Sequence, residues 1–398
     1  MTTTLAPRSE EEFAAAVAAA AQAREPLAIE GNGSKRALLR PVQAARTLST
    51  RNLSGITLYR PTELIISAWA GTPLPEIEAA LAEGGQHIPA EPPDTRAFFG
   101  TSLPATLGGI VAANLSGPRR ITAGAIRDLV MGVRFVNGQG EVVRSGGRVL
   151  KNVTGLDLCK LLTGSHGTLG VITEVTLKVL PAPETTATLA VSVPDLDAGV
   201  RALSAGLGSP YGVTGAAILP DGAPESGLHG PAAILRIEDF ASSVTYRTGR
   251  LADDLAGYGA VSVIEDEVSR PLWRSVRDLA ALGAAPDQAV WRLSVRPTLG
   301  PRAAILLQLA FGARLLLDWG GGLVWAAGPA TQEAHEAVMR AAGEARGTFT
   351  LFRAPEPLRA AVNVIPPEPP ALAAIGTRVK SAFDPAGVFN PGRMRAGL

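Results

Sequence analysis

Four glycine-rich segments are the part of this sequence most suited to chemistry: 30–36, 104–117, 122–128 and 164–173. Glycine lets the main chain bend sharply, and consecutive backbone N–H groups in such bends form concave sites that bind anions. Two loops from different parts of the chain could hold a pyrophosphate from both sides. Each segment taken singly is also explained as a tight turn. As an ordered set, the segments predict a phosphate-binding site built from main chain.

The two common nucleotide-binding motifs do not account for these glycines. A P-loop needs the pattern G-x-x-x-x-G-K-[ST], and no segment supplies it. A Rossmann fingerprint needs G-x-G-x-x-G after the first strand, and the segment GNGSKR has Arg36 where the third glycine belongs. The glycine loops therefore indicate another class of site.

Side chains suited to acid–base chemistry and carboxylate binding are few. The four histidines are scattered, and His335 lies in a helical segment that we expect to face solvent. They form no cluster with acidic residues at metal-ligand spacing, so no metal site is predicted. Arg292 and Arg353 each lie in an apolar strand, where a guanidinium could hold a carboxylate with two hydrogen bonds or form a structural ion pair.

The composition limits the class of protein. The chain has 398 residues, 46% hydrophobic and 18% charged, which predicts two globular domains. A net charge of +1 gives no support for a nucleic-acid partner. The only cysteine, Cys159, excludes an internal disulfide and is expected to be a small buried side chain. Without a secretion signal or a long apolar segment, we expect a cytoplasmic protein, with membrane attachment through a partner left open.

The periodicity of apolar residues predicts the elements that must position these loops. Segment 9–22 is predicted as a helix that begins after Ser9, and segment 171–180 alternates as a strand. After residue 184, strand-like runs alternate with helical runs, which predicts a second α/β domain, and no internal repeat is visible. Segment 372–383 is predicted as a helix, and the run DPAGVFNPGR ends it.

Together these segments resemble a known family. The carriers of the resemblance are the GNGS turn, the run PATLGG…AANLSG…AGAIRD, the run GGRVLKNVTGLDLCKLLTGSHGTLGVITEV and the ending FDPAGVFNPGR. They resemble the FAD-binding domain of the vanillyl-alcohol-oxidase type, also called the p-cresol methylhydroxylase (PCMH) type. The resemblance implies an α+β fold with three parts: a two-subdomain FAD-binding domain over 1–183, a smaller ferredoxin-like α/β cap over 184–365, and a C-terminal segment, 366–398, that packs back on the FAD domain.

The resemblance also implies which residues hold the cofactor. The positions matched to the family's FAD site are Gly31, Asn32, Gly33, Ser34, Lys35, Thr106, Leu107, Gly108, Gly109, Ala112, Asn114, Ser116, Gly124, Asp128, Gly167, Val171, Ile172 and Asn390. Members that tether FAD covalently have a histidine where this chain has Ser34, or a cysteine near the second loop. The implied cofactor is therefore non-covalent FAD.

Within the family, the likeness is to the FAD-binding subunits of bacterial glycolate oxidases. It implies an FAD-dependent oxidoreductase acting on CH–OH groups: an accessory flavin subunit that works with a larger catalytic flavoprotein subunit and an iron–sulfur subunit. Such a complex oxidises glycolate, a 2-hydroxy acid, to glyoxylate. Two alternatives stay open, a self-sufficient dehydrogenase of another hydroxy acid or sugar acid and a scaffold that has lost the flavin. The candidate catalytic residues are Arg292, Arg353 and Lys151, the last in a segment that lies near the flavin's reactive edge in the family.

Overall fold

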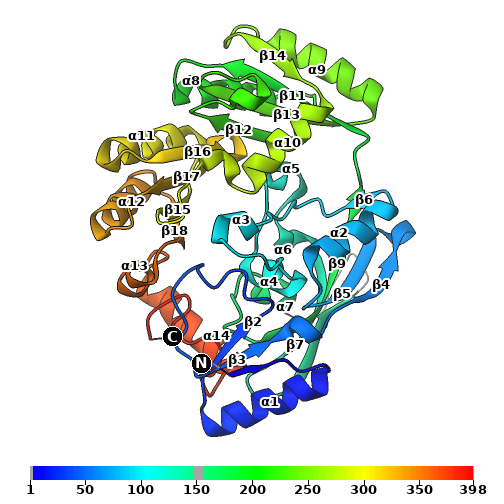
Figure 1. The fold of residues 1–398 in the computed structure, drawn as a ribbon, viewed down its shortest axis with the longest axis vertical. Helices are drawn as coiled ribbons and strands as arrows, with labels where there is room; N and C mark the ends of the chain where they lie inside the picture. Colours follow the sequence, from blue (N-terminus) through cyan, green and yellow to red (C-terminus); the bar gives the residue numbers. More distant parts are fainter. Residues whose placement is uncertain (1–2, 148–155, 398) are drawn as a thin grey trace. The chain divides into compact units, whose positions relative to one another are not determined.

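The chain divides into two compact units (Figure 1). The computed structural model describes residues 3–147 and 156–397. Unit 2 comprises Gly117–Ala123 and Pro183–Pro366, and unit 1 comprises Met1–Ser116, Gly124–Ala182 and Pro367–Leu398. The short segment 117–123 therefore belongs to unit 2, although its neighbours in the sequence belong to unit 1.

Unit 1 contains two main sheets of different kinds, in the mixed α+β organisation that the sequence predicts. A parallel sheet has the order β1-β3-β2, and an antiparallel sheet has the order β4-β5-β9-β7-β8. A short pair, β6 with β10, is added to these. The strands are β1 Thr3–Leu5, β2 Leu27–Glu30, β3 Arg46–Ser49, β4 Ile56–Arg60, β5 Ile65–Trp69, β6 Gln86–His87, β7 Val130–Val136, β8 Val142–Gly146, β9 Val171–Lys178 and β10 Leu180–Pro181.

The helices of unit 1 begin and end on local signals. In α1, Glu10–Ala23, the Ser9 hydroxyl accepts a hydrogen bond from the Glu12 amide at 3.3 Å, which caps the helix where the sequence predicts it. No helix of the described segments is long and apolar enough to cross a membrane. The other helices of this unit are α2 Leu74–Glu83, α3 Arg96–Phe99, α4 Leu107–Ala113, α6 Ile126–Leu129, α7 Leu158–Leu162 and α14 Pro370–Phe383.

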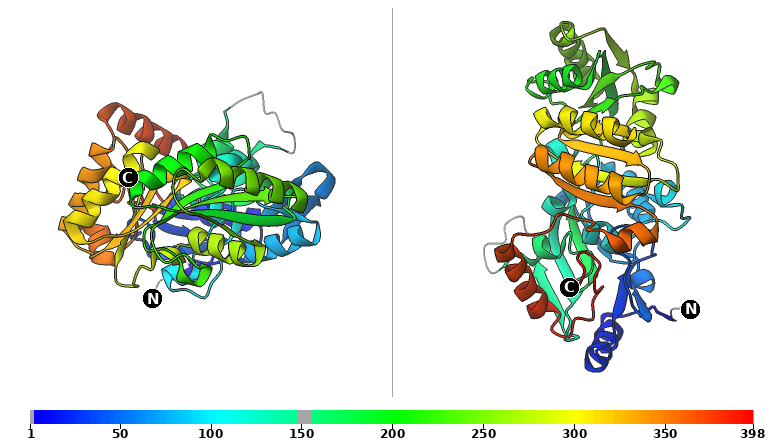
Figure 2. Two further views of the ribbon diagram at one scale, coloured as in Figure 1. Left: turned by 90° about the horizontal axis from the view of Figure 1, so that it is seen from above. Right: turned by 90° about the vertical axis from the view of Figure 1, so that its left-hand side faces the viewer.

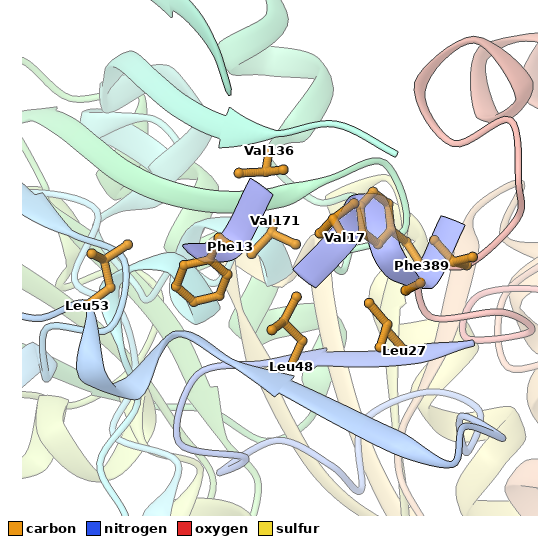
Figure 3. Close-up of a cluster of buried hydrophobic side chains, with 10 residues drawn as sticks. Phe13, Val17, Leu27, Leu48, Leu53, Val136, Val171 and Phe389 are labelled. Atoms are coloured by element: carbon orange, nitrogen blue, oxygen red, sulfur yellow. The ribbon is translucent and has the colours of Figure 1, made fainter. Parts of the chain in front are cut away.

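One cluster of buried apolar side chains joins both sheets of unit 1 to the C-terminal tail (Figure 3). The Leu27 amide donates to the Val388 carbonyl at 2.8 Å, so the tail is also bonded to β2. Each fully buried side chain of this size contributes roughly 1.5–3 kcal/mol through the hydrophobic effect. The tail therefore belongs to unit 1 and completes its core. Members of the cluster include Phe13, Val17, Leu27, Leu48, Val136, Val171 and Phe389.

Unit 2 is built on one antiparallel eight-stranded sheet with the order β14-β11-β13-β12-β16-β17-β15-β18. Each half follows the ferredoxin-like sequence of strand, helix, two strands, helix and strand. The halves join where Ile218 of β12 pairs with Leu317 of β16. The first half is β11 Thr185–Ser192, α8 Leu196–Leu207, β12 Gly215–Leu219, β13 Ala232–Asp239, α9 Ala241–Leu255 and β14 Val261–Ile264. The second is β15 Ala289–Ser294, α11 Gly300–Phe311, β16 Arg314–Asp318, β17 Leu323–Gly328, α12 Gln332–Glu344 and β18 Thr348–Arg353.

This topology contains a structural repeat that is not visible in the sequence. The two halves repeat an arrangement of elements without a recognisable repeat of residues. A strand needs alternating apolar residues and a helix needs apolar residues at helical spacing, and many different residues meet either requirement. Two halves with different residues can therefore fold into the same arrangement of strands and helices.

The two faces of this sheet are covered differently. Helices α9, α8, α11 and α12 lie in a row along one face, and α10, Asp266–Arg277, packs against β11 on the other (Figure 2). Trp291 of β15 lies on the face with the row of helices, because its Nε1 donates to His335 of α12 at 3.1 Å. Successive strand residues point to opposite faces, so Arg292 points away from those helices.

His335 is buried, which corrects the expectation of a solvent-facing histidine. Its side chain is 1% exposed, its Nδ1 accepts the Trp291 hydrogen bond, and its ring lies edge-on to Phe349 at 5.5 Å. Burial lowers the pKa of His335 below its ordinary value, against smaller raising effects from Asn363 and Glu336. A protonated Nδ1 could not accept the Trp291 bond, so the neutral ring is the folded form.

Acidification is therefore expected to destabilise the chain through His335. The unfolded histidine titrates near pH 6.5, and the folded histidine has a lower pKa. The contribution of His335 to the free energy of unfolding is therefore fully present above about pH 6.5 and decreases as the pH falls below that value. Thermal melting followed by tryptophan fluorescence between pH 7.5 and 5 measures this loss. H335L should be less stable at pH 7.5, because Trp291 Nε1 loses its acceptor, and should show a shallower decline with acid. An equal decline in both proteins would contradict the assignment.

Candidate functional site

The first two glycine loops lie against each other in unit 1. Gly31 follows β2, and a Cβ built on it would lie 2.1 Å from Thr106 Oγ1. The Asn32 side-chain amide donates to the Pro104 carbonyl at 3.0 Å. The structure thus brings together two segments that are more than seventy residues apart in the sequence. We call residues 31–35 the first loop and residues 104–109 the second loop.

The first loop carries free main-chain donors. The amides of residues 32–35 donate to no carbonyl or side-chain acceptor in the part of the chain that the structure describes. Gly33 has a φ of +72°, a conformation that favours glycine and is common in loops that bind anions through successive N–H groups. Four neighbouring unpaired donors are the arrangement expected of a main-chain anion site.

The second loop contributes shape rather than donors. The Leu107 amide donates to the Thr72 carbonyl at 2.9 Å, and the Gly108 amide donates to the Ala70 carbonyl at 2.8 Å. The Gly109 amide donates to Thr106 Oγ1 at 3.3 Å and so caps α4. Because these amides are occupied, the second loop offers a surface of small residues against which a ligand in the first loop could lie.

Basic side chains gather at the first loop. Lys35 Nζ lies beside the Ser34 hydroxyl at 3.4 Å, and it forms no ion pair with a carboxylate among residues 3–147 and 156–397. Burial, and then the charge of Arg393, lower the pKa of Lys35 to about 8. Burial and the charges of Arg393 and Lys35 lower the pKa of His166 to about 3. The carboxylate at this loop, that of Glu30, is paired with Arg36, so the charge of Lys35 favours an anionic ligand.

Three of the predicted cofactor residues make hydrogen bonds that hold the loops in place. Asn114 Oδ1 accepts from the Arg127 amide at 3.3 Å, Ser116 Oγ accepts from the Ile126 amide at 2.9 Å, and Asp128 Oδ2 accepts from the Ala125 amide at 2.9 Å. Gly124, at a φ of +79°, lets the chain turn into α6. These contacts order the start of α6, so the polar atoms of these side chains stabilise the fold of unit 1.

The turn at 164–170 packs against the C-terminal tail. Gly167 has a φ of +71°, and a Cβ on it would lie 2.8 Å from Asn390 Nδ2. Asn390 Oδ1 accepts from the Ile29 amide at 2.8 Å, and its Nδ2 donates to the His166 carbonyl at 2.8 Å. The glycines of this turn therefore allow the tail to approach β2 closely. Asn390 supports the site by joining three segments.

The substitution N390A is expected to lower the free energy of unfolding by about 1–3 kcal/mol, because it leaves the amide of Ile29 without its acceptor in a partly buried place. Urea denaturation measures the change. N52A is a matched control, since the Asn52 amide makes one surface hydrogen bond, to Ala6, and its loss should cost under about 0.5 kcal/mol. Equal losses in the two variants would contradict the role of Asn390.

The remaining predicted cofactor residues are mostly occupied in other contacts. The side chains of Val171 and Ile172 are buried at the start of β9, and both residues pair with β7, which leaves main chain as their means of contact with a ligand. The Ala112 carbonyl accepts from the His166 amide at 2.8 Å. Cys159 is 3% exposed, and burial raises its pKa to about 11, so its thiol is unreactive.

Two of the three candidate catalytic residues, Arg292 and Arg353, lie in the described part of the chain. Lys151 lies outside the described residues. Arg353 Nη2 donates to the Ala285 carbonyl, a contact that holds the loop before β15. Burial lowers the pKa of Arg353. Arg292 lies on the face of the unit 2 sheet opposite α12. In the segments described, no three His, Cys, Asp or Glu side chains form a group that could hold a metal ion.

Comparison with known proteins identifies the class. The family described as "FAD binding domain" matches residues 2–146. Among solved structures, p-cresol methylhydroxylase with substrate bound superposes with a TM-score of 0.73 and 12% identity, covering 99% of this chain and 89% of that one. A 4-ethylphenol oxidase from Gulosibacter chungangensis superposes equally well, at a TM-score of 0.73. The predicted fold, an FAD-binding domain of the PCMH type joined to an α/β cap, is confirmed.

Sequence comparison gives the family within that class. The chain is 36% identical to the glycolate oxidase subunit GlcE of Escherichia coli over 94% of both chains. It is 29% identical to the glycolate oxidase subunit GlcD of Bacillus subtilis, over 50% of this chain and 41% of GlcD. The chain belongs to the GlcE family of FAD-linked oxidoreductases, as the sequence motifs predict.

Proposed function

We propose that this chain is the accessory FAD subunit of a complex that oxidises glycolate to glyoxylate. The observation that carries the proposal is the first loop, which combines four unpaired amides with the Lys35 ammonium, while the nearby Glu30 carboxylate is paired with Arg36. These groups would bind the diphosphate of FAD. When bound, FAD would supply the electron acceptor that oxidation of an α-hydroxyl group requires.

The cofactor is held without a covalent bond in this proposal. Ser34 takes the position where tethered relatives have histidine, and its hydroxyl faces Lys35. The buried Cys159 thiol, with its pKa raised to about 11 and its Sγ directed at the Ser145 carbonyl, is unsuited to form a thioether. Denaturation should therefore release free FAD from the protein.

Partner subunits complete the reaction in this proposal. Proton abstraction from a hydroxyl needs an accessible base, usually histidine. His335 is buried in the core of unit 2. The pKa of His166 is about 3, so its imidazole ring is a weak base. In this proposal the base comes from a larger flavoprotein subunit, and an iron–sulfur subunit takes the electrons onward. The resemblance to GlcE, and over half of this chain to GlcD, supports such an assembly.

The test is anaerobic addition of glycolate to the purified FAD-loaded chain, followed by addition of the partner subunits. We expect flavin absorbance to persist with glycolate alone and to fall once the partners are present. Bleaching by glycolate or another hydroxy acid alone would favour a self-sufficient dehydrogenase. A colourless chain that cannot be reconstituted with FAD would overturn the proposal in favour of a scaffold.

A further inference from the structure

The ending DPAGVFNPGR is held in unit 1 by buried polar contacts. Asp384 is 2% exposed, and its carboxylate accepts hydrogen bonds from the amides of Val388 and Phe389 at 3.0 and 2.8 Å. Lys380 Nζ donates to the same carboxylate at 2.6 Å and to the Thr168 carbonyl at 2.8 Å. These contacts shape the tail and bind it to the glycine turn that contains Thr168.

Arg393 of this tail bonds three main-chain carbonyls of the segment that follows β2. Its Nη2 donates to the Lys35 carbonyl at 2.9 Å. Its Nη1 donates to the carbonyls of Arg36 and Arg40 at 3.2 and 3.0 Å, and the Arg40 amide donates back to the Arg393 carbonyl at 3.1 Å. A planar guanidinium carries its donors in a fixed fork, so it holds several carbonyls in set positions, which an ammonium on a flexible stem does not.

The carbonyls that Arg393 holds lie at the exit of the first loop, whereas the four unpaired amides lie before them. Two successive bends close with hydrogen bonds from the Arg36 amide to the Gly33 carbonyl, at 3.3 Å, and from the Leu38 amide to the Lys35 carbonyl, at 3.1 Å. In helical turns of this kind, the N–H groups point back along the chain and the C=O groups point forward. A cation on the carbonyl side therefore stabilises the same peptide orientation that leaves the amides free for an anion.

Arg393 also acts on the charge of Lys35. The pKa of Lys35 is lowered to about 8, first by burial and then by the charge of Arg393. Of the neighbouring groups, His166 is neutral near this pH because its pKa is about 3, and the Glu30 carboxylate is paired with Arg36. Helix α4, which packs beside the Lys35 ammonium, carries no charged residue. The ionisation of Lys35 therefore reports whether the Arg393 guanidinium is in place.

We propose that Arg393 is a positioning residue of the cofactor site, which fixes the first loop from its carbonyl side and makes the tail a part of FAD binding. This inference rests on the proposed function, in which the first loop binds the diphosphate of FAD. Coupling between two binding events is reciprocal. If the ordered tail strengthens FAD binding, bound FAD must therefore stabilise the ordered tail.

The test is titration of the FAD-depleted chain with FAD, followed by flavin fluorescence, as the pH is raised from about 7 through the pKa of Lys35. At about pH 7, R393M is expected to bind FAD at least about tenfold more weakly, because the first loop loses its charged hydrogen-bond donor. The decline of its affinity with rising pH should begin at a higher pH than in wild type, because Arg393 no longer repels the Lys35 ammonium.

Two further variants separate the contact from its charge. R393K keeps the charge but loses the fork, so its pH midpoint should stay near that of wild type while its affinity falls between wild type and R393M. R46M is the matched control in the same unit, because Arg46 is half exposed and paired with Glu25 at 2.9 Å. Its affinity for FAD and its pH midpoint should equal those of wild type.

Hydrogen exchange measures the coupling from the other side. Bound FAD should slow amide exchange in the peptide that covers residues 384–393, and it should slow that exchange less in R393M than in wild type. Exchange in this peptide that FAD leaves unchanged in wild type would contradict the coupling.

The outcomes distinguish this inference from the proposed function. A wild-type chain that binds no FAD would overturn the proposed function and this inference with it. If wild type binds FAD, equal affinity in R393M and R46M overturns the inference alone. A weaker R393M with an unchanged pH midpoint also overturns it, since that result indicates a general loss of stability. If R393M fails to fold by circular dichroism, R393K carries the test, and wild-type affinity in that variant would overturn the inference.

Discussion

Replacing Gly31 by alanine is expected to weaken FAD binding by roughly ten- to a hundredfold, which corresponds to an overpacking cost of about 1–3 kcal/mol. A Cβ at this position would lie 2.1 Å from Thr106 Oγ1 and 3.0 Å from its Cγ2, so the first and second loops must separate. This separation of the two loops displaces the unpaired amides of residues 32–35. Titration of the FAD-depleted chain with FAD, followed by flavin fluorescence, measures the effect.

A second substitution shows whether this clash is the cause. T106A removes the overlapping oxygen and leaves a Cβ at 3.1 Å, so G31A/T106A should bind FAD more tightly than G31A, although T106A alone loses the cap of α4 at a cost of about 1 kcal/mol. G249A is the control, because nothing lies within 4 Å of a Cβ at that helical glycine. Wild-type affinity in G31A would show that these two loops do not bind the cofactor.

Replacing Lys35 by methionine is expected to weaken FAD binding by a similar factor, since a charge-assisted hydrogen bond contributes about 1.5–3 kcal/mol. The same variant should make the FAD-free chain more stable. Burial and Arg393 disfavour the ammonium when no anion is present, and methionine removes that penalty while keeping the apolar stem. If Lys35 had a purely structural role, its replacement would not both weaken FAD binding and stabilise the FAD-free chain.

The pH dependence of FAD binding gives a second measurement on Lys35. Its pKa is about 8 in the free chain, and a bound diphosphate favours the charged form and raises that pKa. Affinity should therefore be constant below about pH 8 and should fall as the pH rises above it, with proton uptake on binding. Calorimetry in buffers of different ionisation enthalpy detects the proton.

The control for both measurements on Lys35 is K160M, because Lys160 is half exposed and paired with Asp157 at 3.4 Å. Its affinity for FAD and its pH profile should match those of wild type. If K35M also retains the wild-type profile, the proposed contact between the ammonium and the diphosphate is wrong.

The sequence by itself determined the elements and the class of protein. Ser9 and Glu12 specify the start of α1 through local hydrogen bonding, and the alternation at 171–178 specifies β9, because these signals act between near neighbours in the chain. The glycine loops predicted a main-chain anion site for the same reason, since the conformations open to glycine are a property of the residue itself. Family motifs then led to the FAD-binding fold.

Only the tertiary structure decided which of these residues carry free donors and charge. Lys35, His166 and Arg393 are far apart in the sequence, and their mutual effect on pKa exists only because folding places them at one loop. The occupied amides of the second loop and the burial of His335 likewise depend on partners from other segments. Hydrogen-bond satisfaction and electrostatic potential are sums over neighbours in space, and a pattern along the chain does not contain them.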